Sequence, residues 1–362
     1  MVFDDTRNQF YADAIKAIID KDSVVMDLGA GLGLHGFIAA RAGAKKVYLV
    51  EPTGVIHVAG RLAKENGLAD KIECCHAKIE RLELPQPVDV IISVFTGNFL
   101  LEEDLLPSLF HARDKHLAKN GVLIPDQAKM FVQAISSEDL FNKNIGLWSG
   151  LSQGLDFSSV QAHAANSIYY DNYRDVNYSP LAPPAEILHM DFMTATTAGC
   201  NARTIIEITQ DGLCHGFLGW FDARLGSNWL STSPTAPKTH WRQVYLPLYP
   251  ALPVHKGQQL AFSLQRPEYG DWSWAIETEG SRQKHSTFLS SPVQPSDLAK
   301  KSDAYKPLQN EKGRLVRQVL DQFNGNTTAG EISQSIYSSQ ETQFYNEADA
   351  RQFIARLIDR YA

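Results

Sequence analysis

The chain has 362 residues, with 34 Lys and Arg against 41 Asp and Glu, a formal net charge of −7. This length predicts two or three domains, because one domain usually holds roughly 100–200 residues. The acidic balance argues against a nucleic-acid partner. No run approaches the roughly 18–20 apolar residues of a membrane span, and no secretion signal follows Met1. We therefore expect a cytoplasmic protein with no membrane partner and, since the cysteines form no Cys-x-x-Cys pair, no metal.

The first third of the chain alternates short apolar runs with helical patterns. Strands are expected at residues 24–27, 47–50, 72–75, 88–93 and 121–124, and helices at 36–42, 55–66 and 103–117. Such alternation predicts an α/β domain with a parallel sheet and helices on both of its faces. We place this domain at residues 1–127.

Residues 128–285 carry a different pattern, with short alternating runs rich in Thr, Tyr, Trp and Phe. The clearest candidate strands are residues 204–209, 216–221, 243–246 and 259–264. This pattern predicts an all-β domain, either a sandwich or a barrel. Residues 141–178 fit it poorly, and we expect them to be an insertion that is helical in part.

The remaining residues predict a linker and a small module. Residues 286–307 are rich in Ser, Pro and Lys, which is typical of a linker. Residues 308–362 contain helical patterns at 313–323, 328–336 and 347–361, so we expect an α-rich module there.

A glycine-rich turn follows the first predicted strand. It comes directly after Asp27 and Leu28 and carries Gly29, Gly31 and Gly33, which let the backbone pass close under a ligand. A dinucleotide site would need a glycine where Leu34 stands, so a nicotinamide oxidoreductase is disfavoured. Glu51 ends the second strand, where its carboxylate can accept hydrogen bonds from two ribose hydroxyls, and this combination suits S-adenosylmethionine. The alternative is a tight packing turn beside a solvated Glu51.

Five ordered motifs resemble the protein arginine methyltransferases, over nearly all of residues 4–280. They are residues 4–11 (DDTRNQFY), 39–48 (AARAGAKKVY), 112–117 (ARDKHL), 123–126 (LIPD) and 231–243, which includes Thr239-His240-Trp241. The resemblance implies a Rossmann-like methyltransferase domain that binds S-adenosylmethionine, followed by a β-barrel substrate domain. It also implies a homodimer, with residues 141–178 as the dimerisation arm.

The resemblance assigns the cofactor-binding residues. Besides Asp27 and the three glycines, they are Glu51 on the ribose, Glu80 on the adenine amino group and Arg7 near the cofactor carboxylate. Arg7 has an alternative role in an ordinary surface salt bridge, which stabilises little. The family usually has an aromatic lid helix before the Asp4 region. Because this sequence starts at Met1, we expect another segment, such as the arm of a second subunit, to cover the cofactor.

The family holds the substrate guanidinium between two glutamates of one loop, because bidentate pairing fixes its orientation. Here Glu103 matches the second glutamate, and Val94 stands in place of the first. Either Glu102 replaces the missing carboxylate, or the acceptor is an amide, an imidazole or a primary amine. The alternative for Glu102 and Glu103 is a structural role, since acidic residues favour the first turn of a helix.

His240 and Asp4 match a proton-relay pair of the family, and Trp241 lies beside them in the expected substrate-binding loop. A His near neutral pKa next to a carboxylate can remove the proton that a nitrogen loses on methylation. A structural, hydrogen-bonded His in an aromatic loop is the alternative.

The C-terminal module resembles the PqqD-like winged-helix elements that bind leader peptides. DNA binding is disfavoured, since residues 297–362 hold equal numbers of basic and acidic side chains, while a plain packing domain is the simpler alternative. The expected function is an S-adenosylmethionine-dependent N-methyltransferase for a peptide or protein side chain, such as a ribosomally made peptide with a leader. The alternatives are a non-arginine nitrogen acceptor, or a catalytically inactive pseudo-enzyme that binds peptides.

Overall fold

The structure is a computed structural model that describes residues 1–362 except for the side chain of Glu341. The chain divides into two compact units, Met1–Pro292 and Val293–Ala362. Within the described residues, no helix combines the length and the apolar character that a membrane crossing requires.

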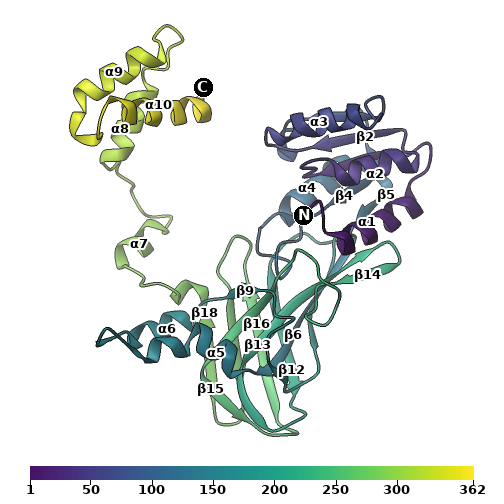
Figure 1. Cartoon of the computed structure of the whole chain (residues 1–362), viewed down its shortest axis with the longest axis vertical. Coiled ribbons are helices and arrows are strands. Elements are labelled where there is room, and N and C mark those ends of the chain that lie inside the picture. The colour runs from purple at the N-terminus through teal and green to yellow at the C-terminus, as the bar shows by residue number, and fades with distance from the viewer. The chain divides into compact units, whose positions relative to one another are not determined.

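A five-stranded parallel sheet opens the first unit, in the order β3-β2-β1-β4-β5 (Figure 1). Its strands are β1 (Val24–Leu28), β2 (Lys46–Val50), β3 (Ile72–Cys75), β4 (Val88–Ser93) and β5 (Leu117–Ile124). Every residue of β1 is buried, as expected for a parallel strand that is covered on both faces. The strand order reverses between β1 and β4, and ligands of such sheets bind outside the carboxyl ends of the strands at this point.

Four α-helices accompany this sheet. They are α1 (Asp5–Ile18), α2 (Leu34–Ala42), α3 (Val55–Glu65) and α4 (Leu106–His116). The prediction of a helix from residue 103 is wrong at its start, because α4 begins at Leu106 with Pro107 in its first turn. Proline suits that position because its missing N–H would have no helical partner there. Glu102 and Glu103 therefore precede the helix, and the alternative that they stabilise its first turn is wrong.

An antiparallel β domain follows, as predicted. Its larger sheet runs β10-β6-β13-β15-β9, with β11 and β14 attached, and its smaller sheet runs β12-β16-β17-β18. The long strands are β6 (Gln127–Ser136), β13 (Gly212–Leu225) and β15 (Gln243–Val254) in the first, and β12 (Cys200–Glu207), β16 (Gln259–Arg266), β17 (Ser273–Glu277) and β18 (Arg282–Ser286) in the second. The short strands are β9 (Tyr169–Asp171), β10 (Ser179–Pro180), β11 (Ala185–Asp191) and β14 (Asn228–Ser231). One hydrophobic cluster runs through both this domain and the parallel sheet, which explains why they form one compact unit.

The insertion at residues 141–178, here called the arm, contains short elements. The helix α5 (Glu138–Asn144) leads into the arm, which then contains the hairpin of β7 (Leu151–Ser152) and β8 (Leu155–Asp156) and the short helix α6 (Gln161–Ala164). Large apolar side chains are exposed on it: Leu147, Leu151 and Leu155 are 52%, 71% and 62% accessible. Exposed apolar side chains of this kind are typical of protein–protein interaction sites.

The second unit is helical. It contains α7 (Pro295–Lys300), α8 (Glu311–Leu320), α9 (Ala329–Ser339) and α10 (Glu347–Tyr361). The last three helices bury a core of their own, made by Leu315, Val319, Ile332, Ile336, Ile354 and Leu357. Thr328 and Glu331 close the start of α9 with a reciprocal capping box. No strand occurs in residues 293–362 as described, so the β wing of a winged helix is not present among them.

Candidate functional site

The glycine turn lies at the carboxyl end of β1 and has the conformation that a ligand cradle needs. Gly29 and Gly31 have positive φ angles of 70° and 52°. A Cβ on Gly31 would meet no atom within 4 Å, so open space lies above its backbone. A Cβ on Gly29 would lie 2.3 Å from the ring of Phe95, so only glycine fits there. The turn thus contacts the loop that follows β4 at Gly29 and faces open space at Gly31.

Glu51 is buried at the carboxyl end of β2 and faces this turn. Its Oε2 accepts a hydrogen bond from the Gly31 N–H at 3.2 Å. Its Oε1 accepts from the backbone N–H and the hydroxyl of Thr53, at 3.0 and 2.7 Å. These contacts fix the carboxylate beside the turn, and each carboxylate oxygen has more than one acceptor site. Glu51 is therefore not merely solvated, and it suits the hydroxyls of a ribose.

Arg7 on α1 is 2% accessible, so the alternative of a surface salt bridge is wrong. Its Nη2 donates to the Met1 carbonyl at 2.9 Å and to Asn8 Oδ1 at 2.7 Å. Its Nη1 is buried and has no hydrogen-bond partner. An unpaired buried donor is costly, and a charged one more so. A carboxylate brought by a ligand would satisfy it, and S-adenosylmethionine carries such a group, so Arg7 fits this cofactor.

Asp27 and Glu80 make contacts of a more structural kind. Asp27 Oδ2 accepts from the Gly36 N–H at 2.7 Å and so holds the first turn of α2. Burial raises the pKa of Asp27 to about 7, although the Gly36 N–H and the Arg7 charge act against this. Glu80 is exposed, and its Oε1 accepts from the Ser108 hydroxyl on α4 at 2.6 Å, which chiefly lowers its pKa.

The predicted pair of Asp4 and His240 meets across 236 residues of sequence. Asp4 Oδ2 lies 2.8 Å from His240 Nδ1 and accepts from the His240 backbone N–H at 2.7 Å. Burial alone would raise the pKa of Asp4, but its hydrogen bonds from Arg7 and His240 hold it below the usual value. Burial lowers the pKa of His240 more than Asp4 raises it, so the imidazole is neutral at pH 7. Because Asp4 accepts, Nδ1 carries the proton and Nε2 has the free lone pair.

The loop at residues 93–104, here called the acceptor loop, leaves β4 and is tied to the same barrel segment. Trp241 Nε1 donates to the Thr96 carbonyl at 2.7 Å. The Arg242 N–H donates to Asn98 Oδ1 at 2.7 Å, and Asn98 Nδ2 donates to Glu102 Oε2 at 2.7 Å. Asn98 therefore links Glu102 to the Thr-His-Trp segment. Trp241 is 4% accessible and serves as an anchor of the acceptor loop.

Glu103 is at the exposed end of the acceptor loop, and its pKa is raised. The first cause is the neighbouring protein, which removes part of the water around its carboxylate, and the second is the like charge of Glu102. Val94 packs against the hydrophobic core at the other end of the loop and brings no polar group to the site. The structure thus places three consecutive carboxylates in the loop, of which Asp104 is paired with Arg266 while Glu102 and Glu103 are not in an ion pair among the described residues.

Three contacts of the loop were missed from the sequence. Asn98 lies in the loop that the resemblance identifies as the glutamate loop, but the sequence does not show with which group its amide pairs. Tyr170, on β9, has a pKa raised by burial and by the nearby Glu102, although no sequence spacing relates the two residues. Asp104 forms an ion pair with Arg266, which is 162 residues further along the chain. No local pattern indicates a contact of that separation.

Comparisons with known proteins agree with this geometry. A profile of the arginine methyltransferase oligomerization subdomain matches residues 126–271, and a methyltransferase-domain profile matches residues 25–121. Protein arginine N-methyltransferase 1 of Schizosaccharomyces pombe is 33% identical over 269 residues, which cover 72% of this chain and 78% of that protein. The histone-arginine methyltransferase CARMER of Drosophila persimilis is also 33% identical, over 72% of this chain, which spans about half (51%) of that relative.

Two solved structures share the fold. The Trypanosoma brucei PRMT1 enzyme–prozyme heterotetrameric complex with AdoHcy matches with a TM-score of 0.73 and 29% identity, over 79% of this chain and 96% of that one. Arabidopsis thaliana protein arginine methyltransferase 10, in an open conformation, matches with a TM-score of 0.69 and 25% identity over the same shares. The chain belongs to the protein arginine methyltransferase family, as an S-adenosylmethionine-dependent methyltransferase of the arginine N-methyltransferase type.

Proposed function

We propose that the protein methylates a nitrogen of a peptide or protein side chain, with arginine as the first candidate acceptor. The observation that carries this proposal is a set of contacts that joins segments far apart in sequence. Asp4 accepts hydrogen bonds from the Arg7 N–H and from His240. Trp241, the neighbour of His240, donates to Thr96 of the acceptor loop, while Glu51 is fixed beside the glycine turn.

Each group has a chemical role in this proposal. When bound, S-adenosylmethionine supplies an electrophilic methyl group on a sulfonium, which is already a good leaving group. Arg7 and Glu51 would hold its carboxylate and its ribose. Glu103 would accept hydrogen bonds from the acceptor N–H groups and so orient the nitrogen, and positioning of this kind supplies much of the rate. His240 Nε2 can accept the proton that the nitrogen loses, while Asp4 fixes the ring and stabilises the charge that forms.

Val94 supports a second acceptor class within this proposal. A guanidinium has five donors in a planar fork, and the acceptor loop offers carboxylates only at its far end. Glu102 Oε2 accepts a hydrogen bond from Asn98, which fixes the direction of this carboxylate, so a guanidinium must approach it in that orientation. A primary amine, an imidazole or an amide needs fewer acceptors. A pseudo-enzyme that binds peptides without methylating them is the outcome if no acceptor reacts.

Glu103→Gln tests the proposed role of the acceptor loop. The amide keeps the size of the side chain but loses the charge, so methyl transfer should fall at least about 100-fold, by the usual scale of misplaced groups. S-adenosylhomocysteine should still bind with its wild-type affinity in isothermal titration calorimetry. Transfer is followed with labelled S-adenosylmethionine and peptides that contain Arg, Lys, His or Gln. Asp114→Asn, an exposed carboxylate on α4, is the control. Unchanged turnover of Glu103→Gln would remove Glu103 from the site.

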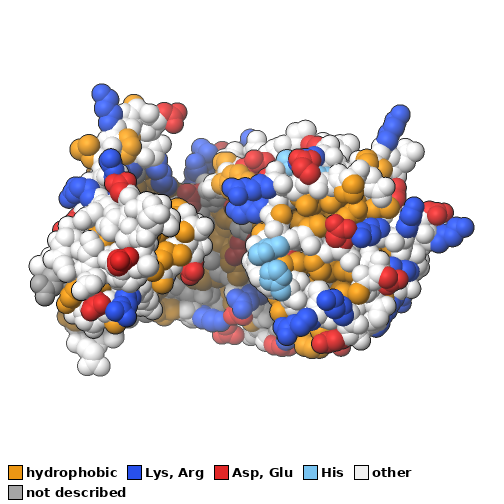
Figure 2. Space-filling model, turned by 90° about the horizontal axis from the view of Figure 1, so that it is seen from above, with side chains coloured by type: hydrophobic (Ala, Val, Ile, Leu, Met, Phe, Trp, Pro, Cys, Tyr) orange, Lys and Arg blue, Asp and Glu red, His pale blue; other side chains and the backbone are white. Residues whose placement is uncertain are grey.

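A homodimer is part of the proposal. The arm exposes Leu147, Leu151 and Leu155, and a second apolar surface lies on α2 and α3. There Leu32, Leu34, Phe37, Ile38 and Leu62 line a hollow of about 250 Å³. Figure 2 shows hydrophobic side chains gathered on the side that carries these helices. Two exposed apolar surfaces on one chain suit a self-complementary pair of contacts. Sedimentation as a monomer at high protein concentration would contradict this.

We also propose, for residues 308–362, the capture of a peptide substrate or its leader, as the PqqD-like resemblance implies. The support is a unit with its own hydrophobic core that still exposes large apolar side chains, such as Leu308 at 92% and Tyr345 at 97%. A chain that ends at Pro292 and methylates a full-length peptide substrate as fast as the whole chain would contradict the proposal.

A further inference from the structure

We propose that Arg266 is a positioning residue, which acts through Asp104 to hold the acceptor loop in the conformation that presents Glu102 and Glu103. This inference rests on the proposed function of that loop. It does not depend on which nitrogen is methylated, because it concerns the conformation of the loop before any acceptor binds.

The contact between Arg266 and Asp104 is bidentate and mostly buried. Arg266 Nη1 and Nη2 each donate to one carboxylate oxygen of Asp104 at 2.7 Å, and the Tyr269 N–H donates to Asp104 Oδ1 at 3.1 Å. Arg266 is 5% accessible, and its Nε has no hydrogen-bond partner. Among the residues that the structure describes, the Arg266 guanidinium forms its ion pair with Asp104. Asp104 directly follows Glu103 in the chain.

The acceptor loop needs such a contact, because its backbone is strained. Phe99, Leu100 and Asp104 have φ angles of 48°, 65° and 52°, in the left-handed region that favours glycine. For residues with a Cβ this conformation is unfavourable, so it persists only where the surrounding structure imposes it. Within the loop, backbone hydrogen bonds join Gly97 to Leu100, Leu101 to Phe99 and Asp104 to Leu101. Contacts from outside the loop add to this restraint.

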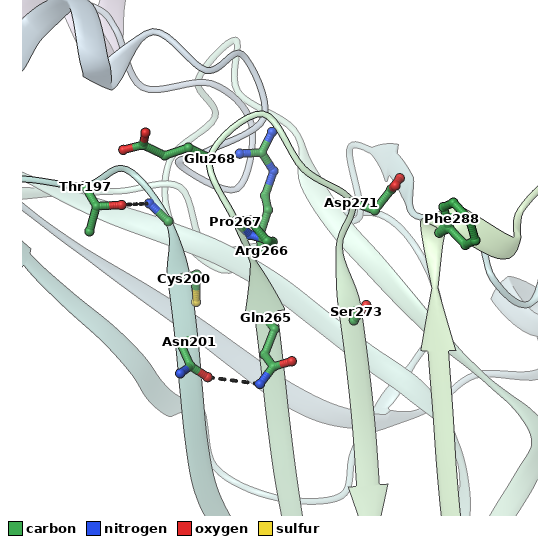
Figure 3. Close-up of a pocket in the computed structure, with 11 residues that line it drawn as sticks. Thr197, Cys200, Asn201, Gln265, Arg266, Pro267, Glu268, Asp271, Ser273 and Phe288 are labelled. Carbon is green, nitrogen blue, oxygen red and sulfur yellow. Dashed lines mark hydrogen bonds between the residues drawn. The ribbon is translucent and has the colours of Figure 1, made fainter. Parts of the chain in front are cut away.

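The hairpin between β16 and β17 supplies this restraint at two points. The Arg266 guanidinium lies 5.2 Å from the centre of the Trp272 ring, and that ring lies 5.2 Å from the ring of Phe99. Phe99 is fully buried, so the hairpin holds one strained residue by packing and another, Asp104, by charge. Figure 3 shows Arg266 extending from the end of β16, at the rim of a surface pocket of about 970 Å³ that Glu268 and Asp271 also line.

The chain contains a matched pair that serves as a control. Arg224, on β13, forms a similar bidentate pair with Asp126: Nε lies 2.8 Å from Oδ1, and Nη2 also contacts Oδ2. This pair also connects the barrel to the end of the parallel sheet, but it does not contact the acceptor loop. Arg224 is 34% accessible and so more exposed than Arg266, and its substitution disrupts a bidentate ion pair without the positioning effect.

The test compares Arg266→Lys with Arg224→Lys in the full-length protein. Lysine keeps the charge but cannot form the planar two-bond contact. Hydrogen–deuterium exchange of peptides that cover residues 93–104 should become about tenfold faster or more in Arg266→Lys, since exchange reports local opening. Arg224→Lys should leave these peptides at the wild-type rate. Unchanged exchange in Arg266→Lys, or an equal increase in both variants, would overturn the proposal.

A second variant keeps the test decisive if Arg266→Lys folds poorly. Asp104→Asn retains the shape and tolerates the left-handed conformation but loses the charge, so its exchange should rise above the wild-type rate. Wild-type exchange in Asp104→Asn would contradict a role for the ion pair. With a reactive peptide in hand, Asp104→Asn should lower kcat/KM for the acceptor and leave S-adenosylhomocysteine affinity unchanged. Because the exchange measurement needs no substrate, it distinguishes failure of this inference from failure of the proposed function.

Discussion

Replacing Val94 by Glu places a carboxylate at the position where the family resemblance implies one, and so tests what the acceptor is. In the present loop, a bound guanidinium would leave at least one N–H without an acceptor on the Val94 side. An unpaired buried donor costs about 1–3 kcal/mol. At about 1.4 kcal/mol for each factor of ten, this corresponds to roughly 5- to 150-fold in kcat/KM.

Two effects reduce this gain in Val94→Glu. Val94 is partly buried against the hydrophobic core, so a charged side chain there loses some packing and some hydration. Glu103 already has a raised pKa beside Glu102, and a third carboxylate nearby would raise it further. We therefore expect a net increase of about tenfold for arginine peptides at pH 8, where the carboxylates are ionised, and a smaller increase at pH 6.

The assay is transfer of labelled methyl groups to matched peptides that differ only in the acceptor residue. Val94→Gln is the control, since it has nearly the same size as Glu and can accept one hydrogen bond but has no charge. S-adenosylhomocysteine affinity should be equal in all three proteins. If Val94→Glu methylates arginine no better than wild type, or if Val94→Gln gains as much, the missing carboxylate does not determine the acceptor.

Two further predictions concern cofactor binding and acid stability. Arg7→Met should weaken S-adenosylhomocysteine binding at least about tenfold, because a hydrogen bond to a charged group is worth about 1.5–3 kcal/mol. Arg41→Met, on the exposed face of α2, is the control and should leave the affinity unchanged. Equal calorimetric affinities of the two variants would show that Arg7 Nη1 does not contact the ligand. Burial lowers the pKa of His35 to about 3 and that of His285 to about 4. The folded state therefore binds fewer protons than the unfolded chain, so this stability is complete above pH 6.5 and is lost as pH falls toward the folded pKa values. Between pH 6.5 and 5 the loss is about 1.5 kcal/mol for each residue, and urea unfolding at the two pH values measures it. His285→Gln should lose less, and an equal loss in that variant would contradict the assignment.

The parallel sheet could be predicted from the sequence because each strand is a short, continuous apolar run. β3 and β4 have the predicted bounds, and Glu51 lies next to the glycine turn because β1 and β2 are neighbours in the sheet. The start of α4 was predicted incorrectly, because Glu102, Glu103 and Asp104 look like an acidic first turn. The better signal was Pro107, which marks the first turn directly.

Other features of the site could not be predicted, because they depend on contacts between distant segments. The unpaired Nη1 of Arg7 follows from how α1 packs, and the sequence shows only an arginine near the start of the chain. The left-handed conformation of Asp104 is imposed by Arg266 and by the packing of Phe99, so no local propensity indicates it. A sequence pattern can therefore identify the acceptor loop, but its conformation depends on the barrel.

The barrel consequently takes part in building the site. His240 binds Asp4, Trp241 binds the Thr96 carbonyl and Arg266 binds Asp104, so barrel residues reach the start of α1 and both halves of the acceptor loop. Because these contacts end on residues next to the proposed catalytic groups, changes in the barrel can alter the acceptor site without touching it. Val94 stands where the resemblance implies a carboxylate, while Glu102 is anchored by Asn98 and Glu103 lies beside it. An acceptor site that is anchored from outside can tolerate the loss of one of its own side chains, because its shape does not depend on that side chain. The Val94 substitution therefore changes the charge that the site presents to an acceptor more than it changes the architecture of the site.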